Sequence, residues 1–200
     1  VLLLGASGVG KDLAAEYIHR RSARNGQAFN MIDCTAVTES VFERELFGHE
    51  RGAFAGCIGR RPGMFERTDG GTLFFNEIGD LPQGMQGRLL GAMETGQFRR
   101  VGGRELLSVY TRLVCASRKI LRQLVARNQV RADLYYRIAG IIGDIPSLDQ
   151  RRTDIPELAG ALLQRMGSGN GPAYRLTNDA IEVLLDHDYP GNVRELHNIL

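Results

Sequence analysis

The chain has 200 residues, of which 43% are hydrophobic, and carries a formal net charge of +2. This length and apolar content can bury a sizeable core, as one domain or as one domain with a small appendage. The weak charge does not indicate a nucleic-acid-binding surface, and the sequence has no apolar run as long as a membrane span, so neither association is predicted for this segment.

The first predicted element is an apolar strand over Val1–Leu4, which leads through a glycine-rich loop into a helix over Leu13–Ser22. The loop is the Gly-x-x-x-x-Gly-Lys pattern and the residue after it: Gly5, Ala6, Ser7, Gly8, Val9, Gly10, Lys11 and Asp12. Glycines let successive backbone N–H groups turn toward phosphate oxygens, and the lysine and the helix N-terminus add positive charge. The pattern therefore predicts a site for nucleotide phosphates.

Asp12 departs from the general form of this loop. Ser or Thr usually follows the lysine and offers its hydroxyl to Mg²⁺, whereas this chain has a carboxylate. Either Asp12 contacts the metal or the metal is held elsewhere.

Strand-like and helix-like stretches then alternate, which is typical of an α/β protein with a mostly parallel sheet. The predicted strands are Phe29–Asp33, Thr72–Asn76 and Arg112–Ala116, and the predicted helices are Ser40–Phe47, Gln83–Glu94 and Ile120–Ala126, with Pro82 in a first turn.

Strand patterns end after Pro146. The remaining pattern predicts helices over Ile155–Arg165, Asp179–His187 and Val193–Leu200, caps at Thr177 and Asn192, and a flexible loop over Gly167–Pro172. We therefore expect an α/β domain over residues 1–147 and a small all-helical domain over 148–200 that is truncated at its end.

A second group of candidate residues ends the strand over Thr72–Asn76. A P-loop ATPase places a Mg²⁺ ligand and a water-polarising carboxylate after such a strand. Asn76 occupies the metal position, where an aspartate is expected, and Glu77 occupies the position of the catalytic base. An ordinary strand end is the alternative, but the preceding phosphate loop favours the functional interpretation.

Cys34, Cys57 and Cys115 are odd in number and lack metal-ligand spacing. They fit buried thiols in a reducing compartment, so we expect a cytoplasmic protein. The chain begins within a strand and ends within a helical pattern, which predicts a domain from a longer protein.

Several longer segments carry a resemblance to a known family. They are Glu45–Gly56 (ELFGHERGAFAG), Gly71–Pro82 (GTLFFNEIGDLP), Arg100–Gly103 (RVGG), Asp133–Arg137 (DLYYR) and Pro190–Leu196 (PGNVREL). With the loop over Gly5–Asp12, these segments resemble the AAA+ domain of bacterial enhancer-binding proteins, which activate sigma-54 RNA polymerase. The resemblance implies a three-layer α/β/α core with a helical lid. It also implies an ATP- and Mg²⁺-dependent ring, usually hexameric, that remodels the closed promoter complex, with DNA bound through a domain outside this chain.

The resemblance assigns roles to individual residues. Gly5–Asp12 is similar to the Walker A loop, where this family commonly has an acid after the lysine, and Glu77 is similar to the Walker B glutamate. Arg131 and Arg137 match two arginines that reach into the ATP site of the neighbouring subunit; solvated surface residues are the alternative. Arg194 matches the sensor II arginine, and its alternative is an exposed residue paired with Glu195 or another acid.

The family's loop that contacts the sigma factor corresponds, by this resemblance, to Gly52, Ala53, Phe54, Ala55 and Gly56. The family has threonine where Ala55 stands, so a hydroxyl is lost. Phe54 is either an apolar plug for a partner or a buried anchor of the loop. The glycine-rich hairpin over Arg99–Glu105 is expected to be a second pore-facing loop.

Other departures lie at the nucleotide site. Asn76 replaces the Walker B aspartate, and Asp33 stands where the family has an asparagine that restrains the catalytic glutamate, as if the two residue types were exchanged. Ser117-Arg118 replaces a Thr-Asn pair at sensor I, which predicts a cation near the γ-phosphate, and residues 148–152 (LDQRR) depart from a Leu-Arg-Glu-Arg hinge. These changes predict slow hydrolysis and an unchanged fold.

Three functions remain open at this point. The chain is an ATPase that activates sigma-54 transcription, a nucleotide-binding regulatory module with impaired hydrolysis that acts by assembly or repression, or an unrelated AAA+ remodeller such as an unfoldase. The loop around Phe54 argues against the third.

Overall fold

The computed structural model describes residues 1–35, 38–166 and 174–200. It contains two compact units, one formed by Val1–Leu4 with Asp12–Gly143 and one formed by Gly5–Lys11 with Asp144–Leu200. The predicted loop over Gly167–Pro172 lies outside the described residues. In the part of the chain that is described, no helix is both long and apolar enough to cross a bilayer.

A five-stranded sheet in the order β2-β5-β8-β1-β9 forms the centre of the first unit. Its strands are β1 (Leu2–Leu4), β2 (Phe29–Asp33), β5 (Thr72–Asn76), β8 (Arg112–Ser117) and β9 (Ile142–Asp144). β1 pairs with β8, β8 with β5 and β5 with β2, all in parallel. The predicted α/β class and parallel sheet are therefore confirmed, and the carboxyl ends of these four strands meet at one edge.

Strand β9 was not predicted from the sequence. It is three residues long and interrupted by Gly143, and its side chains are not buried. It lies at the edge of the sheet beside β1, where the Leu2 N–H donates to Ile141 O at 2.8 Å. A short edge strand has no buried apolar run, so it gives no hydropathy signal.

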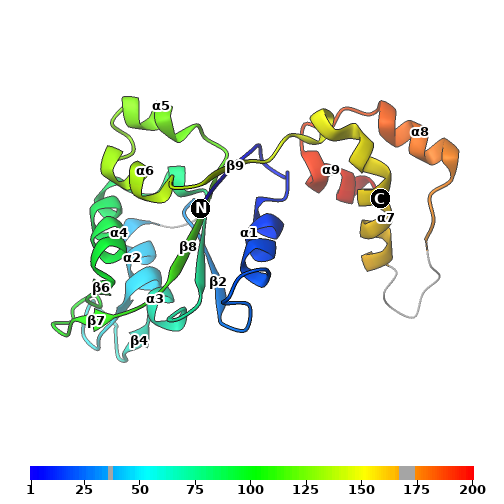
Figure 1. The fold of residues 1–200 in the computed structure, drawn as a ribbon. Helices are drawn as coiled ribbons and strands as arrows, with labels where there is room; N and C mark the ends of the chain where they lie inside the picture. Colours follow the sequence, from blue (N-terminus) through cyan, green and yellow to red (C-terminus); the bar gives the residue numbers. More distant parts are fainter. Residues whose placement is uncertain (36–37, 167–173) are drawn as a thin grey trace. The chain divides into compact units, whose positions relative to one another are not determined.

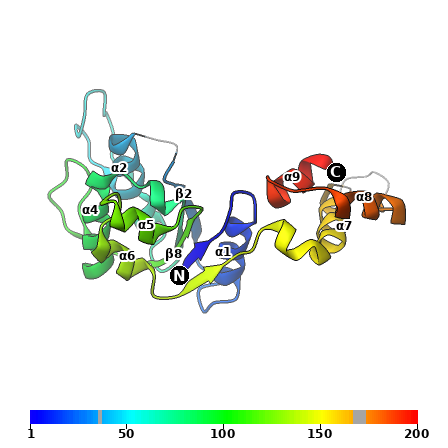
Figure 2. The ribbon, with the colours of Figure 1, turned by 90° about the horizontal axis from the view of Figure 1, so that it is seen from above.

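Helices cover both faces of this sheet and complete three layers. α1 (Lys11–Arg20) lies on one face, and the other helices lie on the opposite face (Figures 1 and 2). These are α2 (Glu39–Phe47), α3 (Met64–Arg67), α4 (Gln83–Thr95), α5 (Leu121–Ala126) and α6 (Ala132–Ile138). The bounds of α1, α2, α4 and α5 agree with the predicted helices to within about two residues. No helix was predicted over α6, and α3 is a single turn that periodicity does not detect.

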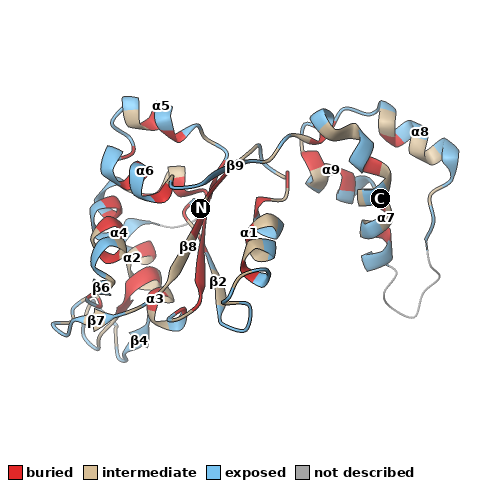
Figure 3. Ribbon diagram, viewed as in Figure 1, coloured by how far each residue is buried: buried red, intermediate tan, exposed pale blue. Residues whose placement is uncertain are grey.

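The central strand β5 shows how the two faces are packed. Leu73 and Phe75 belong to the main core, which also contains Phe42 of α2 and Leu89 of α4. Thr72 faces α1, where its Oγ1 lies 3.0 Å from Nδ1 of buried His19. Figure 3 shows buried positions along the strands and on the helix faces turned toward them. Because β5 is buried on both faces, both its ends are fixed in space, including the polar residues that follow it.

Two small hairpins extend this unit. One pairs β3 (Gly48–His49) with β4 (Arg61–Pro62), and the other pairs β6 (Gln97–Phe98) with β7 (Leu107–Ser108). The predicted hairpin around Arg99–Glu105 is confirmed as the connection between β6 and β7. A 3₁₀ turn, η1 (Ile78–Asp80), follows β5.

The second unit is helical from η2 (Leu148–Asp154) onward. α7 (Ile155–Met166), α8 (Asn178–Asp186) and α9 (Asn192–Ile199) pack around Leu148, Ile155, Tyr189 and Leu196. The cap at Thr177 is confirmed, since its side chain accepts a hydrogen bond from Ala180 N. The predicted cap at Asn192 is wrong: Gly191 is the N-cap, and Asn192 is the first helical residue, with a φ of 54°.

Candidate nucleotide site

The glycine-rich loop joins β1 to α1 and has the backbone of a phosphate-binding loop. Gly8 and Gly10 have φ values of 79° and 97°, which L side chains rarely adopt. A Cβ at Gly8 would also lie 2.2 Å from Gly191 O, so only glycine fits there. The buried Lys11 donates from Nζ to Gly5 O and Ala6 O, each at 3.0 Å. Its side chain therefore lies across the loop that is predicted to bind the nucleotide phosphates.

This loop belongs to the second compact unit, and residues of the helices in that unit contact it. Arg194 Nη1 donates to Ser7 Oγ at 3.2 Å, and its backbone N–H donates to Gly8 O at 3.3 Å. The alternative pairing of Arg194 with Glu195 is not what the structure contains, because Glu195 accepts from His187 and from Gly191 N. Arg194 therefore lies beside the predicted phosphate loop, as its assignment requires.

Asn192 and Arg151 also contact the loop, and the sequence did not indicate either contact. The buried Asn192 donates from Nδ2 to Ser7 O at 3.0 Å and accepts at Oδ1 from Leu148 N at 2.8 Å. These bonds explain why Asn192 does not cap α9: its side chain is used between the loop and η2. Arg151 Nη2 donates to Val9 O at 2.9 Å.

Asp12 lies exposed in the first turn of α1. There a carboxylate is stabilised by the N-terminal end of the helix dipole. The structure gives this residue no contact that would mark it as a metal ligand, so its predicted metal contact stays a prediction.

Asp33 and Asn76 are brought together at the carboxyl ends of β2 and β5. They are register partners, and Asn76 Nδ2 donates to Asp33 Oδ2 at 2.8 Å. The other carboxylate oxygen accepts from Thr35 N at 2.8 Å and from Thr35 Oγ1 at 2.5 Å. Burial would raise the pKa of Asp33, but these hydrogen bonds, together with the charge of Arg118, outweigh it and lower the pKa. Asp33 is therefore a carboxylate at neutral pH.

Glu77 follows Asn76 directly and has an unusual backbone. Its φ and ψ are 53° and 51°, in the left-handed region, and its side chain is buried. Non-glycine residues in this region are held there at a cost of about 1–3 kcal/mol and are found mostly at functional sites. Glu77 Oε2 accepts a hydrogen bond from the Arg118 N–H at 2.8 Å, so the carboxylate is oriented from the end of β8.

The side chains of Arg118 and Lys119 both pair with Asp80. Arg118 Nη2 lies 3.6 Å from Asp80 Oδ2, and the Lys119 ammonium contacts Oδ1. The cation predicted at sensor I thus lies at the end of β8, where in this structure it pairs with an aspartate of η1 that also contacts Lys119.

The oxygen donors at this edge fit a magnesium ion that arrives with a nucleotide. Among the described residues, no group of three or more His, Cys, Asp or Glu is placed to hold a metal alone. Mg²⁺ in nucleotide enzymes is bound by one or two protein oxygens, by phosphates and by water. Asp33 and Asn76 supply a carboxylate and an amide oxygen of that type.

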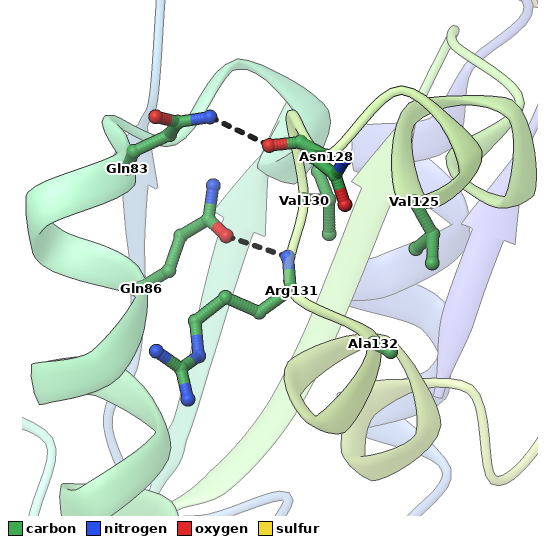
Figure 4. Close-up of a pocket in the computed structure, with 7 residues that line it drawn as sticks. All are labelled: Gln83, Gln86, Val125, Asn128, Val130, Arg131 and Ala132. Atoms are coloured by element: carbon green, nitrogen blue, oxygen red, sulfur yellow. Dashed lines mark hydrogen bonds between the residues drawn. The ribbon is translucent and has the colours of Figure 1, made fainter.

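Arg131 is positioned by a buried glutamine on α4. The backbone N–H of Arg131 donates to Oε1 of Gln86 at 2.8 Å, and Nε2 of the buried Gln86 donates to Gln129 O at 2.9 Å. Figure 4 shows the bond between Gln86 and Arg131 beside a pocket of about 340 Å³. The guanidinium group of Arg131 is exposed and forms a two-bond pair with Asp133, at 3.0 and 2.7 Å. The backbone of Arg131 is therefore fixed, while its charge is accessible.

Arg137 lies in the last turn of α6 and is also exposed. Its Nη2 donates to Met93 O, near the end of α4, at 3.1 Å. The two arginines thus lie at the two ends of α6, with Arg131 as its N-cap residue.

The loop over Gly52–Gly56 is closed at its base, because the Gly52 N–H donates to Cys57 O at 3.0 Å. Phe54 is 37% exposed. Its ring packs against α2, with the Arg44 guanidinium carbon 4.3 Å from the ring centroid and the His49 ring at 5.2 Å. Phe54 is thus neither fully buried nor fully projecting, and Ala55 is exposed beside it.

The β6–β7 connection lies against the base of this loop. The Glu50 N–H donates to Val101 O and the Val101 N–H donates to Gly48 O, both at 3.0 Å. A Cβ at Gly102, whose φ is 73°, would lie 2.9 Å from Ala53 Cβ. The two predicted pore-facing loops therefore form one packed structure.

Arg100 is the charged centre of that structure. Its side chain is 2% exposed and pairs with Glu50 at 2.6 Å and with Glu66 through two hydrogen bonds, one of them at 2.8 Å. The hydrogen bonds to Glu66 and Glu50 outweigh burial and raise the pKa of Arg100. Burial would raise the pKa of Glu66, but its bonds to Arg100 and Gly63 N lower it, so its share of the stability is present at neutral pH and lost as the pH falls through that lowered pKa.

Arg100→Ala is expected to destabilise the fold by about 3–5 kcal/mol, because it leaves two partly buried carboxylates without their cation. Urea unfolding at pH 7 measures this. Arg99→Ala, at an exposed position next to it, is the matched control and is expected to change stability by less than about 0.5 kcal/mol. Equal losses in the two variants would contradict the assignment.

The three cysteines are free. Cys34 and Cys115 are buried as predicted, and burial raises the pKa of both thiols. Cys57 is only partly buried, because it lies at the base of the exposed loop, so the prediction of three buried thiols is wrong for this residue.

Known proteins resemble the chain over its whole length. The Nif-specific regulatory protein of Azotobacter vinelandii is 46% identical over 200 residues, which are 100% of this chain and 38% of that protein. The transcriptional regulatory protein ZraR of Escherichia coli K12 is 47% identical over 199 residues, or 99% of this chain and 45% of that protein. The chain thus spans less than half the length of these relatives.

Solved structures agree with the fold. NtrX from Brucella abortus matches 99% of this chain and 45% of its own, with a TM-score of 0.89 and 32% identity, and its complex with ATP matches with a TM-score of 0.87. Hsp104 of S. cerevisiae matches with a TM-score of 0.76 at 19% identity, which shows the fold alone. The sigma-54 interaction domain family matches residues 1–142, and the AAA+ ATPase lid domain family matches residues 149–200. The chain therefore belongs to the sigma-54 interaction domain family of AAA+ proteins.

Proposed function

We propose that this chain is the ATP-binding and ATP-hydrolysing central domain of a sigma-54-dependent transcriptional regulator, which remodels the closed complex of RNA polymerase. The observation that carries the proposal is that two functional features each follow a strand of one parallel sheet. The Gly5–Lys11 loop follows β1, and the strained, oriented Glu77 follows β5. A phosphate cradle and a carboxylate that polarises water are the two parts ATP hydrolysis needs.

Residues 1–147 serve in this proposal as the nucleotide-binding subdomain and residues 148–200 as the lid. Bound ATP supplies the phosphates and Mg²⁺ neutralises their charge. The loop from Gly5 to Asp12 holds the phosphates, and Arg194 reports their state from the lid. Support comes from the NtrX complexes with ATP and ADP and from the contact of Arg194 with Ser7.

Homo-oligomerisation into a ring, with six subunits as the expected number, completes the site. Arg131 and Arg137 then act on the ATP of a neighbouring subunit. The loop containing Phe54 contacts sigma-54, and DNA is bound by a domain outside this chain. We expect the protein to work in the cytoplasm.

A second candidate function is a nucleotide-binding regulatory module with impaired hydrolysis, which acts by assembly or repression. A specific observation favours it: the last residue of β5 is the neutral Asn76, and the side chain of Arg118 pairs with Asp80. Both candidates require ATP binding, and only the first requires turnover.

Lys11→Ala is expected to weaken ATP binding sharply, because it removes the one charge that the loop itself directs at the phosphates. Titration with a fluorescent ATP analogue measures the affinity, and a thermal melt of each variant confirms folding. Lys119→Ala, whose ammonium pairs with Asp80, is the matched control and is expected to bind with unchanged affinity. Equal affinity of Lys11→Ala and the unaltered chain would refute both functions.

Ala55→Thr is expected to strengthen capture of sigma-54 in the presence of a transition-state analogue of ATP. The substitution restores a hydroxyl beside Phe54, and one neutral hydrogen bond contributes about 0.5–1.5 kcal/mol, or up to about tenfold in affinity. Phe54→Ala is expected to abolish capture, and Ile58→Ala, at an exposed apolar position just beyond the loop, serves as the control. If neither the unaltered chain nor Ala55→Thr captures sigma-54, the regulatory module is the better account.

A further inference from the structure

The amide and carboxylate at the ends of β2 and β5 form a defined pair. The bond from Asn76 Nδ2 to Asp33 Oδ2 fixes the amide, so that its donor end faces the carboxylate. Among the described residues, Asp33 Oδ1 accepts two hydrogen bonds from Thr35, and Oδ2 accepts the one from Asn76. Because a carboxylate oxygen can accept about two hydrogen bonds, Oδ2 keeps a position for a cation or a water bound to one.

The negative charge of this pair lies at the end of β2, whereas it is expected at the end of β5. P-loop ATPases bind Mg²⁺ with an aspartate that follows the strand corresponding to β5, and this chain has a neutral amide there. The carboxylate lies on the adjacent strand instead, opposite Asn76 in the register. Mg²⁺ requires hard oxygen ligands and is held most strongly where one of them is charged.

Resting on the proposed function above, we infer that Asp33 supplies the anionic protein ligand of nucleotide-bound Mg²⁺, directly or through a bound water, and that Asn76 is its positioning partner. Asp33 stands where relatives have the asparagine that restrains the catalytic glutamate. A different donor, the Arg118 N–H, orients Glu77 in this chain. A backbone donor provides that bond whatever side chain residue 33 carries, so Asp33 is available for the metal.

The inference predicts that the Mg²⁺ requirement of nucleotide binding depends on the Asp33 carboxylate. Binding of a fluorescent ATP analogue is measured in EDTA and at rising Mg²⁺. Asp33→Asn is expected to need about 10- to 100-fold more Mg²⁺ for the same affinity, the range seen when groups that support a metal site are lost. Its affinity in EDTA is expected to match that of the unaltered chain.

Two further variants separate the charge from the hydrogen bond. Asn76→Ala removes the hydrogen bond between Asn76 and Asp33 but keeps the Asp33 carboxylate, so a much smaller shift in Mg²⁺ requirement is expected. Asp69→Asn makes the same chemical change at an exposed position beyond the opposite end of β5 and is expected to cause no shift. If Asn76→Ala shifts the requirement as far as Asp33→Asn does, Asn76 is the ligand and the inference is overturned.

The exchange variant Asp33→Asn/Asn76→Asp keeps one carboxylate, one amide and the bond between them, so it is the variant most expected to fold. It is expected to regain the Mg²⁺ requirement of the unaltered chain, and failure to do so in a folded variant overturns the inference. If the unaltered chain binds no nucleotide under any condition, the proposed function fails with it. If it binds nucleotide and Asp33→Asn leaves the Mg²⁺ requirement unchanged, only the inference fails.

Discussion

Alanine at Arg131 or Arg137 is expected to lower ATP hydrolysis by about 10³- to 10⁵-fold, the range for arginines that a neighbouring molecule inserts into a phosphoryl-transfer site. Both guanidinium groups are exposed on α6. Arg131 pairs with Asp133 and Arg137 with a backbone carbonyl. Exposed pairs of this kind are weak, so a phosphate of the adjoining subunit can replace them. ATP binding is expected to stay unchanged.

Phosphate release at a protein concentration that supports assembly measures this effect. Arg127→Ala, at an exposed arginine that ends α5, is the matched control and is expected to keep full activity. Mixing Arg137→Ala with Lys11→Ala is expected to restore part of the turnover, because each supplies the group that the other lacks. No recovery in mixed assemblies would contradict action between subunits.

Glu77→Gln is expected to lower hydrolysis by about 10²- to 10⁴-fold, the usual contribution of a general base, while ATP still binds. The amide oxygen of glutamine can accept the Arg118 N–H in place of the carboxylate, so the local structure is kept. The negative charge and the basic group are lost.

Single-turnover hydrolysis with saturating ATP isolates this step from binding. Glu94→Gln, an exposed glutamate in the last turn of α4, is the control with the same chemical change. Activity of Glu77→Gln close to that of the unaltered chain would show that another group activates the water.

The sheet and helices could be predicted where the chain carries a strong local pattern. β5 was predicted to its exact bounds, because four consecutive residues are apolar or β-branched, glycines precede them and the polar Asn76 ends the run. β9, α3 and the hairpin of β3 with β4 were not, since elements of two to four residues have too few positions for a period to show.

The candidate site could likewise be predicted from the sequence only in part. The loop from Gly5 to Lys11 and the strand end at Glu77 are continuous in sequence, so they could be read directly. The contacts of Gln86 and Asn192 could not, because both residues act through partners far along the chain. In the sequence Gln86 looks like an ordinary helix residue and Asn192 like a helix cap. The pairing of Asp33 with Asn76 was suggested by their exchange of residue types, and the register of β2 with β5 shows it.

In the proposed function, this chain hydrolyses ATP in an assembly of its own copies. ATP turnover per subunit, measured as the concentration of the unaltered chain rises and together with the mass of the assembly, tests this directly. Turnover is expected to rise together with assembly and to disappear on dilution. Assembly that binds ATP but shows no turnover above that of Glu77→Gln would contradict it.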